Sequence, residues 1–171
     1  ANGCGKSTLI KLLTGAIDAQ KGVIEYGYNV EVGYYDQENQ NLDESKTVID
    51  ELWDCYPTLP EQKIRGTLAW FNFFGEDVYK TVKMLSGGER ARLTFSKLIL
   101  SHMNLLILDE PTNHLDIDSR ESLESALEEF DGTIIAVSHD RYFVEKLASR
   151  IIELKPDGYI DGDMFDYQIT R

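Results

Sequence analysis

Two carboxylates, Asp109 and Glu110, directly follow the aliphatic run 105–108. Four aliphatic residues in a row are too few for a helix and predict a short strand buried on both faces. Open parallel α/β sheets hold their ligands at the carboxyl ends of the strands, and Pro111 would end the strand there. A carboxylate pair at such an edge suits a hydrated Mg²⁺ and a base for water. A buried strand that ends in a solvated acidic turn would have the same pattern.

A second group of chemically suited residues opens the chain, which reads Ala-Asn-Gly-Cys-Gly-Lys-Ser-Thr over 1–8 and continues into an apolar helical stretch closed by Gly15. Glycines let a phosphate approach the backbone, and amides at the start of a helix point at phosphate oxygens. Lys6 would reach the β- and γ-phosphates, while the Ser7 hydroxyl would ligate Mg²⁺. We therefore expect a nucleotide-phosphate loop made of Asn2, Gly3, Cys4, Gly5, Lys6, Ser7 and Thr8.

The full phosphate-loop pattern requires a further glycine five places before Gly5, which is a position before Ala1. The strand that delivers such a loop would also come earlier. The sequence is therefore interpreted as a segment of a longer protein that begins inside the motif, with the first strands of its sheet missing.

Two polar residues follow predicted strands. Gln37 comes after the apolar stretch 30–35, and His139 comes after the stretch 133–137, which predicts another buried strand. A histidine at the same sheet edge could touch a γ-phosphate. Either residue could also be an ordinary polar group, Gln37 in a loop and His139 in a structural hydrogen bond.

The segment Leu-Ser-Gly-Gly-Glu at 85–89 opens a predicted helix that runs to about Leu100. Ser86 is the expected N-cap and Glu89 the matching third residue of a capping box. The glycines Gly87 and Gly88 leave the backbone amides bare, and bare amides at a helix start form an anion site. The segment is thus a second candidate phosphate contact, or simply a well-capped helix.

The remaining pattern predicts the elements that position these groups. The stretches 22–26 and 30–35 predict an antiparallel hairpin, and residues 150–160 predict another at the end of the chain. Helices are expected from Thr47 and from about Glu61. An aromatic cluster is expected in the core: Trp70, Phe71, Phe73 and Phe74.

A further helix is expected after the Asp109 strand, capped by Asp118 and Glu121 and ended near Gly132. Its apolar face would hold Leu123, Ala126, Leu127 and Phe130.

Composition excludes several classes of protein. The 171 residues carry 17 basic and 30 acidic side chains, a net charge of −13, so no direct grip on nucleic acid is expected from this surface. The two cysteines suit a reducing compartment. No apolar run reaches the ~20 residues of a membrane helix. These features predict a cytoplasmic domain without membrane insertion.

In their order along the chain, these segments resemble the motifs of an ATP-binding-cassette (ABC) ATPase. Residues 3–8 are similar to the Walker A loop without its first glycine, and residues 105–110 to Walker B. Gln37 matches the Q-loop and His139 the switch histidine. Residues 85–89 match the signature motif, and Leu115 with Asp116 the D-loop.

The resemblance implies an α/β P-loop NTPase domain with a mostly parallel core sheet flanked by helices. Residues 1–37 would hold the phosphate loop and a β-hairpin of the catalytic core, and residues 38–84 a helical subdomain. Residues 85–171 would carry the signature helix, Walker B, the D-loop, the switch histidine and a C-terminal hairpin.

Two segments are similar to the F class of this family, namely 110–116 and 138–143, and residues 119–124 resemble the second cassette of that class. Members carry two cassettes on one chain, have no membrane domain and commonly act on the ribosome. The resemblance therefore implies a second cassette as partner, on the same intact chain. It also implies the ribosome as a partner of the intact protein, with a task in translation or antibiotic protection.

The resemblance also assigns roles, with ATP and Mg²⁺ as cofactors. Lys6 and the loop amides would hold the phosphates, and Glu110 would polarise the attacking water while His139 steadies the γ-phosphate. Mg²⁺ would be organised by Ser7, Gln37 and Asp109, and the opposite cassette's ATP would be contacted by Ser86, Gly87 and Gly88.

Two other functions stay open. The ATPase subunit of a membrane transporter would share every chemical residue, although the segment 112–114 and the match around Ser138 favour the F class. A cassette that binds ATP as a structural clamp would not hydrolyse it. Glu110 and His139 favour hydrolysis, because a pure clamp needs no poised carboxylate.

Overall fold

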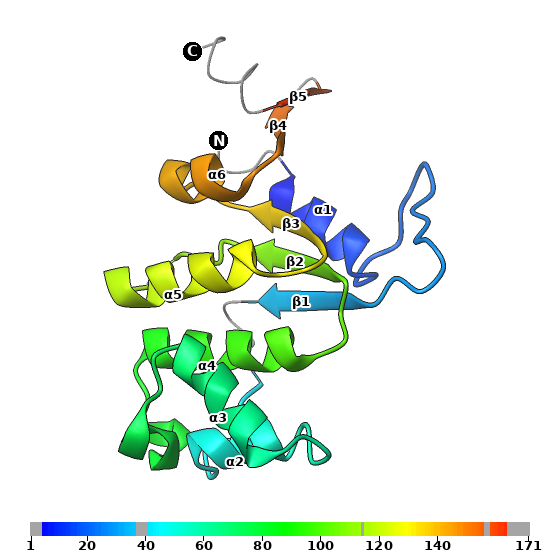
Figure 1. The fold of residues 1–171 in the computed structure, drawn as a ribbon. Helices are drawn as coiled ribbons and strands as arrows, with labels where there is room; N and C mark the ends of the chain where they lie inside the picture. The colour runs from blue at the N-terminus through cyan, green and yellow to red at the C-terminus, as the bar shows by residue number, and fades with distance from the viewer. Residues whose placement is uncertain (1–4, 37–40, 114, 156–157, 164–171) are drawn as a thin grey trace.

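The computed structural model describes residues 5–36, 41–113, 115–155 and 158–163. Its core is a three-stranded sheet in the order β1-β2-β3, formed by Val32–Asp36, Leu105–Asp109 and Thr133–Val137. β1 and β3 both pair parallel with β2, so the carboxyl ends of all three strands meet at one edge (Figure 1).

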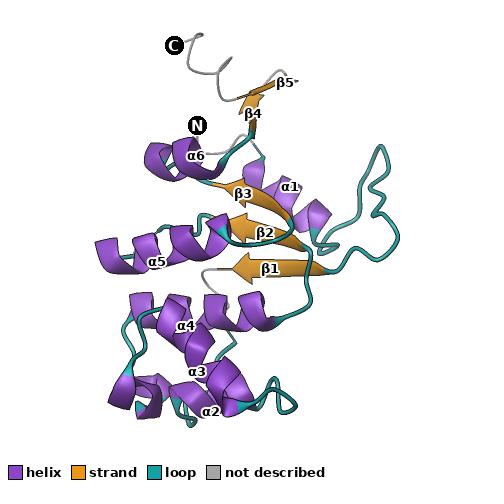
Figure 2. Cartoon of the chain, in the orientation of Figure 1, coloured by secondary structure: helices purple, strands orange, loops and turns teal. Residues whose placement is uncertain are grey.

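Helices cover both faces of this sheet (Figure 2). On one face, Ile10 of α1 (Lys6–Leu13) packs with Leu105 and Ile107 of β2. On the other face, Leu106 and Leu108 belong to the larger core that includes α4 (Gly87–Leu100) and α5 (Ile117–Glu128). Alternate strand residues point to opposite faces, and all four aliphatic residues of β2 are buried, as the sequence predicted.

The segment between β1 and α4 is helical. It contains α2 (Val48–Trp53), α3 (Glu61–Trp70) and the 3₁₀ turns η1 (Gly75–Tyr79) and η2 (Val82–Met84). Thr47 caps α2 by accepting a hydrogen bond from the Asp50 amide at 3.2 Å, so both helices expected here are confirmed.

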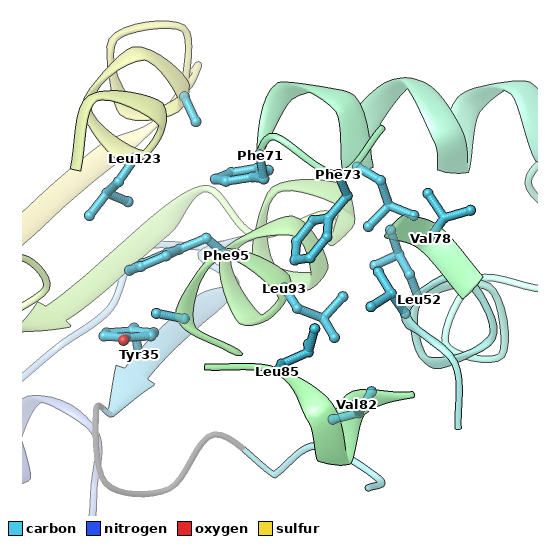
Figure 3. Close-up of a cluster of buried hydrophobic side chains, with 14 of the residues drawn as sticks. Tyr35, Leu52, Phe71, Phe73, Val78, Val82, Leu85, Leu93, Phe95 and Leu123 are labelled. Atoms are coloured by element: carbon cyan, nitrogen blue, oxygen red, sulfur yellow. The ribbon is translucent and has the colours of Figure 1, made fainter. Parts of the chain in front are cut away.

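One apolar cluster joins the helical segment to the sheet (Figure 3). Tyr35 of β1 stacks on Phe95 of α4 with ring centroids 4.2 Å apart, and Phe71 and Phe73 are buried in the same cluster. The prediction of a fully buried aromatic group was wrong for Trp70 and Phe74, which are 55% and 59% exposed. Trp70 lies off the buried face of α3, which Ile64 and Leu68 form and Phe71 continues.

The predicted hairpin over 22–35 was wrong. Residues 22–26 form no strand, and β1 pairs parallel with the distant β2. Val23 and Tyr28 are 81% and 96% exposed, whereas Val30 packs against the cluster of Ile10, Leu105 and Ile107. Strand propensity was read correctly for β1, but it carries no information about which strand is the partner.

The start of α5 also differs from the prediction. Asp116 is the N-cap, because its Oδ1 accepts a hydrogen bond from the Ser119 amide at 2.7 Å, whereas Asp118 lies inside the first turn and Glu121 further along the helix. Phe130 lies beyond the last helical residue, Glu128.

β3 is only partly buried and is one of the two edge strands of the described sheet. Its expected burial on both faces was therefore wrong. After it come α6 (Arg141–Leu147) and an antiparallel hairpin of β4 (Arg150–Lys155) and β5 (Gly158–Asp163), which confirms the predicted C-terminal hairpin. Within the described ranges, no helix has the length and apolarity needed to cross a membrane.

Candidate functional site

The amino end of α1 faces the carboxyl edge of the sheet with a bare cap. Gly5 occupies the N-cap position with a left-handed φ of 90°, and no described side chain caps the helix there. A residue with a Cβ would be strained in this conformation, so glycine is suited to the turn. The amides of the first helical turn, from Lys6 to Thr8, remain suited to an anionic ligand.

Two carboxylates stand side by side at this edge. Asp36 and Asp109 are register partners on β1 and β2, and Asp109 lies on the same sheet face as Leu105 and Ile107, the face that α1 covers. Burial and the Asp36 carboxylate raise the pKa of Asp109, while Lys6 opposes the shift. Sequence reasoning did not select Asp36, because its place beside Asp109 depends on the strand order.

These donors fit a magnesium ion. Oxygen ligands are what Mg²⁺ requires, and a cation would relieve the repulsion that raises the pKa of Asp109. Ser7 is exposed on the first turn of α1, whose amino end faces this edge. The chemistry of the adjacent Asp36 and Asp109 carboxylates fits such an ion.

Glu110 begins the loop after β2 in an unusual backbone conformation. Its φ of 47° is left-handed, and its amide donates a hydrogen bond to the Val137 carbonyl at 2.8 Å. This turn directs the Glu110 carboxylate toward α1, where its Oε1 lies 3.9 Å from Lys6 Nζ.

His139 completes a compact group with Lys6 and Glu110. Its Nε2 lies 2.5 Å from Lys6 Nζ and 3.1 Å from Glu110 Oε1, and its amide donates to Glu110 Oε2 at 3.1 Å. Nε2 of His139 cannot accept a hydrogen bond from the Lys6 ammonium and donate one to the Glu110 carboxylate at the same time. It therefore bonds to one of these two partners at a time. The His139 imidazole, the Glu110 carboxylate and the Lys6 ammonium therefore lie together at the first turn of α1.

The segment 85–89 lies elsewhere. The predicted capping box is present, with Ser86 Oγ accepting from the Glu89 amide and Glu89 Oε2 accepting from the Ser86 amide. Ser86 and Gly87 are exposed, and their helix α4 lies on the sheet face opposite α1 (Figure 1). Ser86 and Lys6 therefore belong to helices on opposite faces of the sheet.

Gly88 is buried where α4 meets the start of α5. A Cβ on Gly88 would lie 3.2 Å from Asp116 Oδ2 and from Ser119 Oγ, so the two helices approach closely there. Arg92, which sequence reasoning did not select, donates from Nη1 to Ser119 Oγ at 2.6 Å and lies 3.9 Å from Asp116 Oδ1. Gly88 thus lies close to Asp116, and Arg92 of the same helix lies within 4 Å of the Asp116 carboxylate.

The structure brings Lys6, Glu110 and His139 together and sets Asp109 beside them. Four predicted site residues lie outside the described residues: Asn2, Gly3, Cys4 and Gln37. Thr8 is exposed on the first turn of α1.

Several known proteins have sequences related to this chain. Residues 1–113 match the family model described as ABC transporter. The protein YdiF of Bacillus subtilis (strain 168) is 55% identical over 166 residues, which is 97% of this chain and 26% of YdiF. ABC transporter F family member 5 of Arabidopsis thaliana is 45% identical over 168 residues, 97% of this chain and 24% of that protein. The chain thus spans about a quarter of the length of these relatives.

A solved structure shares the fold. The dimeric ATP-binding cassette MJ0796, in a post-hydrolysis state bound to ADP and Pi, superposes with a TM-score of 0.74 at 19% sequence identity. The match covers 96% of this chain and 82% of that one. The chain therefore belongs to the ABC transporter family as one of its ATP-binding domains, and its relatives include members of the F class, as its motifs predicted.

Proposed function

We propose that this domain binds ATP together with Mg²⁺ and hydrolyses it as one of two cassettes that close on each other. The observation that carries the proposal is the meeting of Lys6, Glu110 and His139 at the carboxyl edge of the sheet. A cation for phosphate, a carboxylate for water and a histidine at one point are the parts that phosphoryl transfer to water needs.

Each part has a distinct task in this proposal. Lys6 and the first-turn amides of α1 bind the phosphates, and Asp109 and Ser7 hold Mg²⁺, which when bound neutralises charge on the phosphate oxygens. Glu110 orients the attacking water and accepts its proton. The imidazole of His139 turns from Lys6 to the γ-phosphate when the nucleotide occupies the site.

In this proposal the signature segment binds the nucleotide of the second cassette. The exposure of Ser86 and Gly87 at the start of α4, a helix on the sheet face opposite α1, supports this role. In this proposal residues 38–84 are the helical subdomain, and residues 1–37 with 85–171 form the catalytic core. Asn2, Gly3 and Cys4 extend the phosphate loop, and Gln37 joins the Mg²⁺ ligands.

For the intact protein we propose two cassettes on one chain that act in the cytoplasm at the ribosome, in translation or antibiotic protection. Similarity to F-class relatives supports this assignment. Co-sedimentation of the full-length protein with ribosomes, dependent on ATP, is the expected result. Co-purification with a membrane permease in place of ribosomes would overturn it.

Single-turnover ATP hydrolysis by the full-length protein tests the chemistry. Glu110→Gln should slow hydrolysis by about 100-fold or more while ATP binding persists, because the amide cannot accept the proton of water. The matched control is Glu121→Gln, which removes an exposed carboxylate from α5 and should leave the rate unchanged.

Two outcomes would count against the proposal. A wild-type rate in Glu110→Gln would remove the assigned role of this carboxylate. Tight ATP binding by the unaltered protein without any turnover would favour a structural clamp.

A further inference from the structure

Ion pairs of both orientations join α5 to α6. Arg120 Nη1 of α5 lies 2.6 Å from Asp140 Oδ2, and Lys146 Nζ of α6 lies 3.1 Å from Glu124 Oε2. Lys146 also lies 3.6 Å from Glu128 Oε1 of α5. Arg120 and Glu124 are four residues apart and so share one face of α5. The cation lies on α5 in the first pair and on α6 in the others. Sliding one helix along the other would therefore bring like charges together.

In the ion pair closer to the site, Arg120–Asp140, the Asp140 carboxylate makes two kinds of contact. Asp140 Oδ1 accepts hydrogen bonds from the amides of Tyr142 at 3.0 Å and Phe143 at 3.2 Å, which caps α6. Its Oδ2 is left for Arg120. The amide of Asp140 donates to Ser138 Oγ at 3.0 Å, which tightens the same turn. Asp140 therefore fixes the end of this loop to the first turns of α5.

His139 depends on that loop for its orientation. Its side chain is 55% exposed, so packing alone does not hold the ring. On one side its backbone amide is held by Glu110, and on the other its neighbour Asp140 is held by Arg120. The ring reaches Lys6 and Glu110 only while both ends of the loop stay in place.

Within the described residues, Arg120 forms no hydrogen bond or ion pair with Lys6, Glu110 or the His139 ring. Its Nε is buried without a hydrogen-bond partner within the described part of the chain. Burying an unsatisfied donor costs free energy, so the guanidinium is held in place at a local cost. The charge-assisted contact between the Arg120 guanidinium and the Asp140 carboxylate offsets this cost.

We propose that Arg120 is a positioning residue for His139, acting through Asp140. The pair Glu124–Lys146 holds the same two helices further from the loop and serves as an internal comparison. The effect on catalysis rests on the proposed function, whereas the effect on the loop does not.

Amide hydrogen exchange tests the loop directly. Arg120→Gln should raise the exchange rates of the His139, Tyr142 and Phe143 amides by about 10-fold or more, relative to the amides of β2. Arg120→Lys, which keeps the charge, should hold these rates within about 3-fold of the parent protein. Reference to β2 separates local loosening from global loss of stability.

The matched control removes the other ion pair as a unit. The double variant Glu124→Gln/Lys146→Gln leaves no buried charge unpaired, which matters because Glu124 is buried. It leaves only Glu128, whose side chain is 46% exposed, without its Lys146 partner. It should leave exchange at His139 unchanged within about 2-fold relative to β2. An equal effect of this double variant would show that general helix docking, and not Arg120, holds the loop, and would overturn the proposal.

Kinetics of the full-length protein give the second readout. Arg120→Gln should lower kcat for ATP hydrolysis by about 10-fold with KM for ATP changed less than about 3-fold, and Arg120→Lys should restore most of the rate. Unchanged exchange at His139 in Arg120→Gln would overturn the proposal whatever the rate. A parent protein that binds no ATP would overturn the proposed function, while the exchange result would still decide the role of Arg120.

Discussion

At the scale of single residues, Asp116 links the D-loop position to the start of α5. Hydrogen bonds from the Ser119 hydroxyl and amide hold the pKa of Asp116 below its usual value, and Arg92 adds to the shift. A carboxyl whose pKa is lowered by folding stabilises the folded state above its unfolded pKa of 3.8, and that contribution is lost as the pH falls through the folded pKa.

Asp116→Ala should therefore lower the free energy of unfolding by about 0.5–2 kcal/mol at pH 7, the usual cost of a lost N-cap. The difference between variant and parent should shrink as the pH falls below about 4, because the protonated carboxyl caps poorly. Urea unfolding at pH 7 and pH 3 measures both values. Asp118→Ala is the control, and should cost only about 0.3–0.5 kcal/mol through the helix dipole; equal losses would contradict the assigned cap.

At the scale of elements, two glycines should respond to alanine with opposite signs. Gly132 precedes β3, where a Cβ would lie 2.7 Å from the Asn104 carbonyl oxygen and 2.5 Å from the Phe130 ring. Gly66 lies inside α3 with nothing within 4 Å of the corresponding position.

Gly132→Ala should destabilise the protein by about 1–3 kcal/mol through overpacking. Gly66→Ala should stabilise it by about 0.5–1 kcal/mol, because alanine is the better helix former. Thermal unfolding of the two variants beside the parent gives both signs in one experiment. A stabilising Gly132→Ala would mean that β3 does not approach the Asn104 loop as described.

The helical segment is pinned to α4 by a buried ion pair. Glu51 of α2 is almost fully buried, and its Oε1 lies 2.5 Å from Lys97 Nζ. Lys97→Met should cost about 3–5 kcal/mol because it leaves a buried charge alone. The double variant Glu51→Gln/Lys97→Met should recover much of that loss, as measured by urea unfolding. A larger loss in the double variant would contradict this explanation.

The elements that sequence predicted well are those that local chemistry decides. The capping box of Ser86 and Glu89 and the cap of α2 at Thr47 need only residues three positions apart, and both are present. Pairing of strands is decided by distant partners, so the expected hairpin over 22–35 failed while β1 itself was found. The exposure of Trp70 likewise depends on which face of α3 meets the core.

The same distinction holds for the site. Lys6, Glu110 and His139 could be chosen because each follows a recognisable local pattern, and the fold places them together. Asp36 and Arg120 act through neighbours that are remote in sequence, Asp109 and Asp140, so no local pattern marked them.

At the scale of the whole molecule, the shared core predicts a single unfolding unit. Both tryptophans, Trp53 and Trp70, lie in the segment 38–84, so their fluorescence reports on the helical segment alone. Circular dichroism reports on all helices and strands. Because the cluster of Figure 3 joins the segment to the sheet, the two signals should change at the same urea concentration.

Phe95→Ala tests the centre of this junction. It removes the ring that stacks on Tyr35 and should lower the free energy of unfolding by about 3–5 kcal/mol. A fluorescence transition at lower urea than the dichroism transition in the parent protein would show instead that residues 38–84 unfold independently.

Glu110 stands on a left-handed backbone, where an L side chain costs about 1–2 kcal/mol that glycine would not. Glycine would relieve this strain but would lose the contacts of the carboxylate with Lys6 and with the His139 amide. A lineage that no longer needed the reaction would no longer be selected to keep the strained residue and could accept glycine here. A glycine at position 110 in a related sequence would then mark a domain that has lost the reaction.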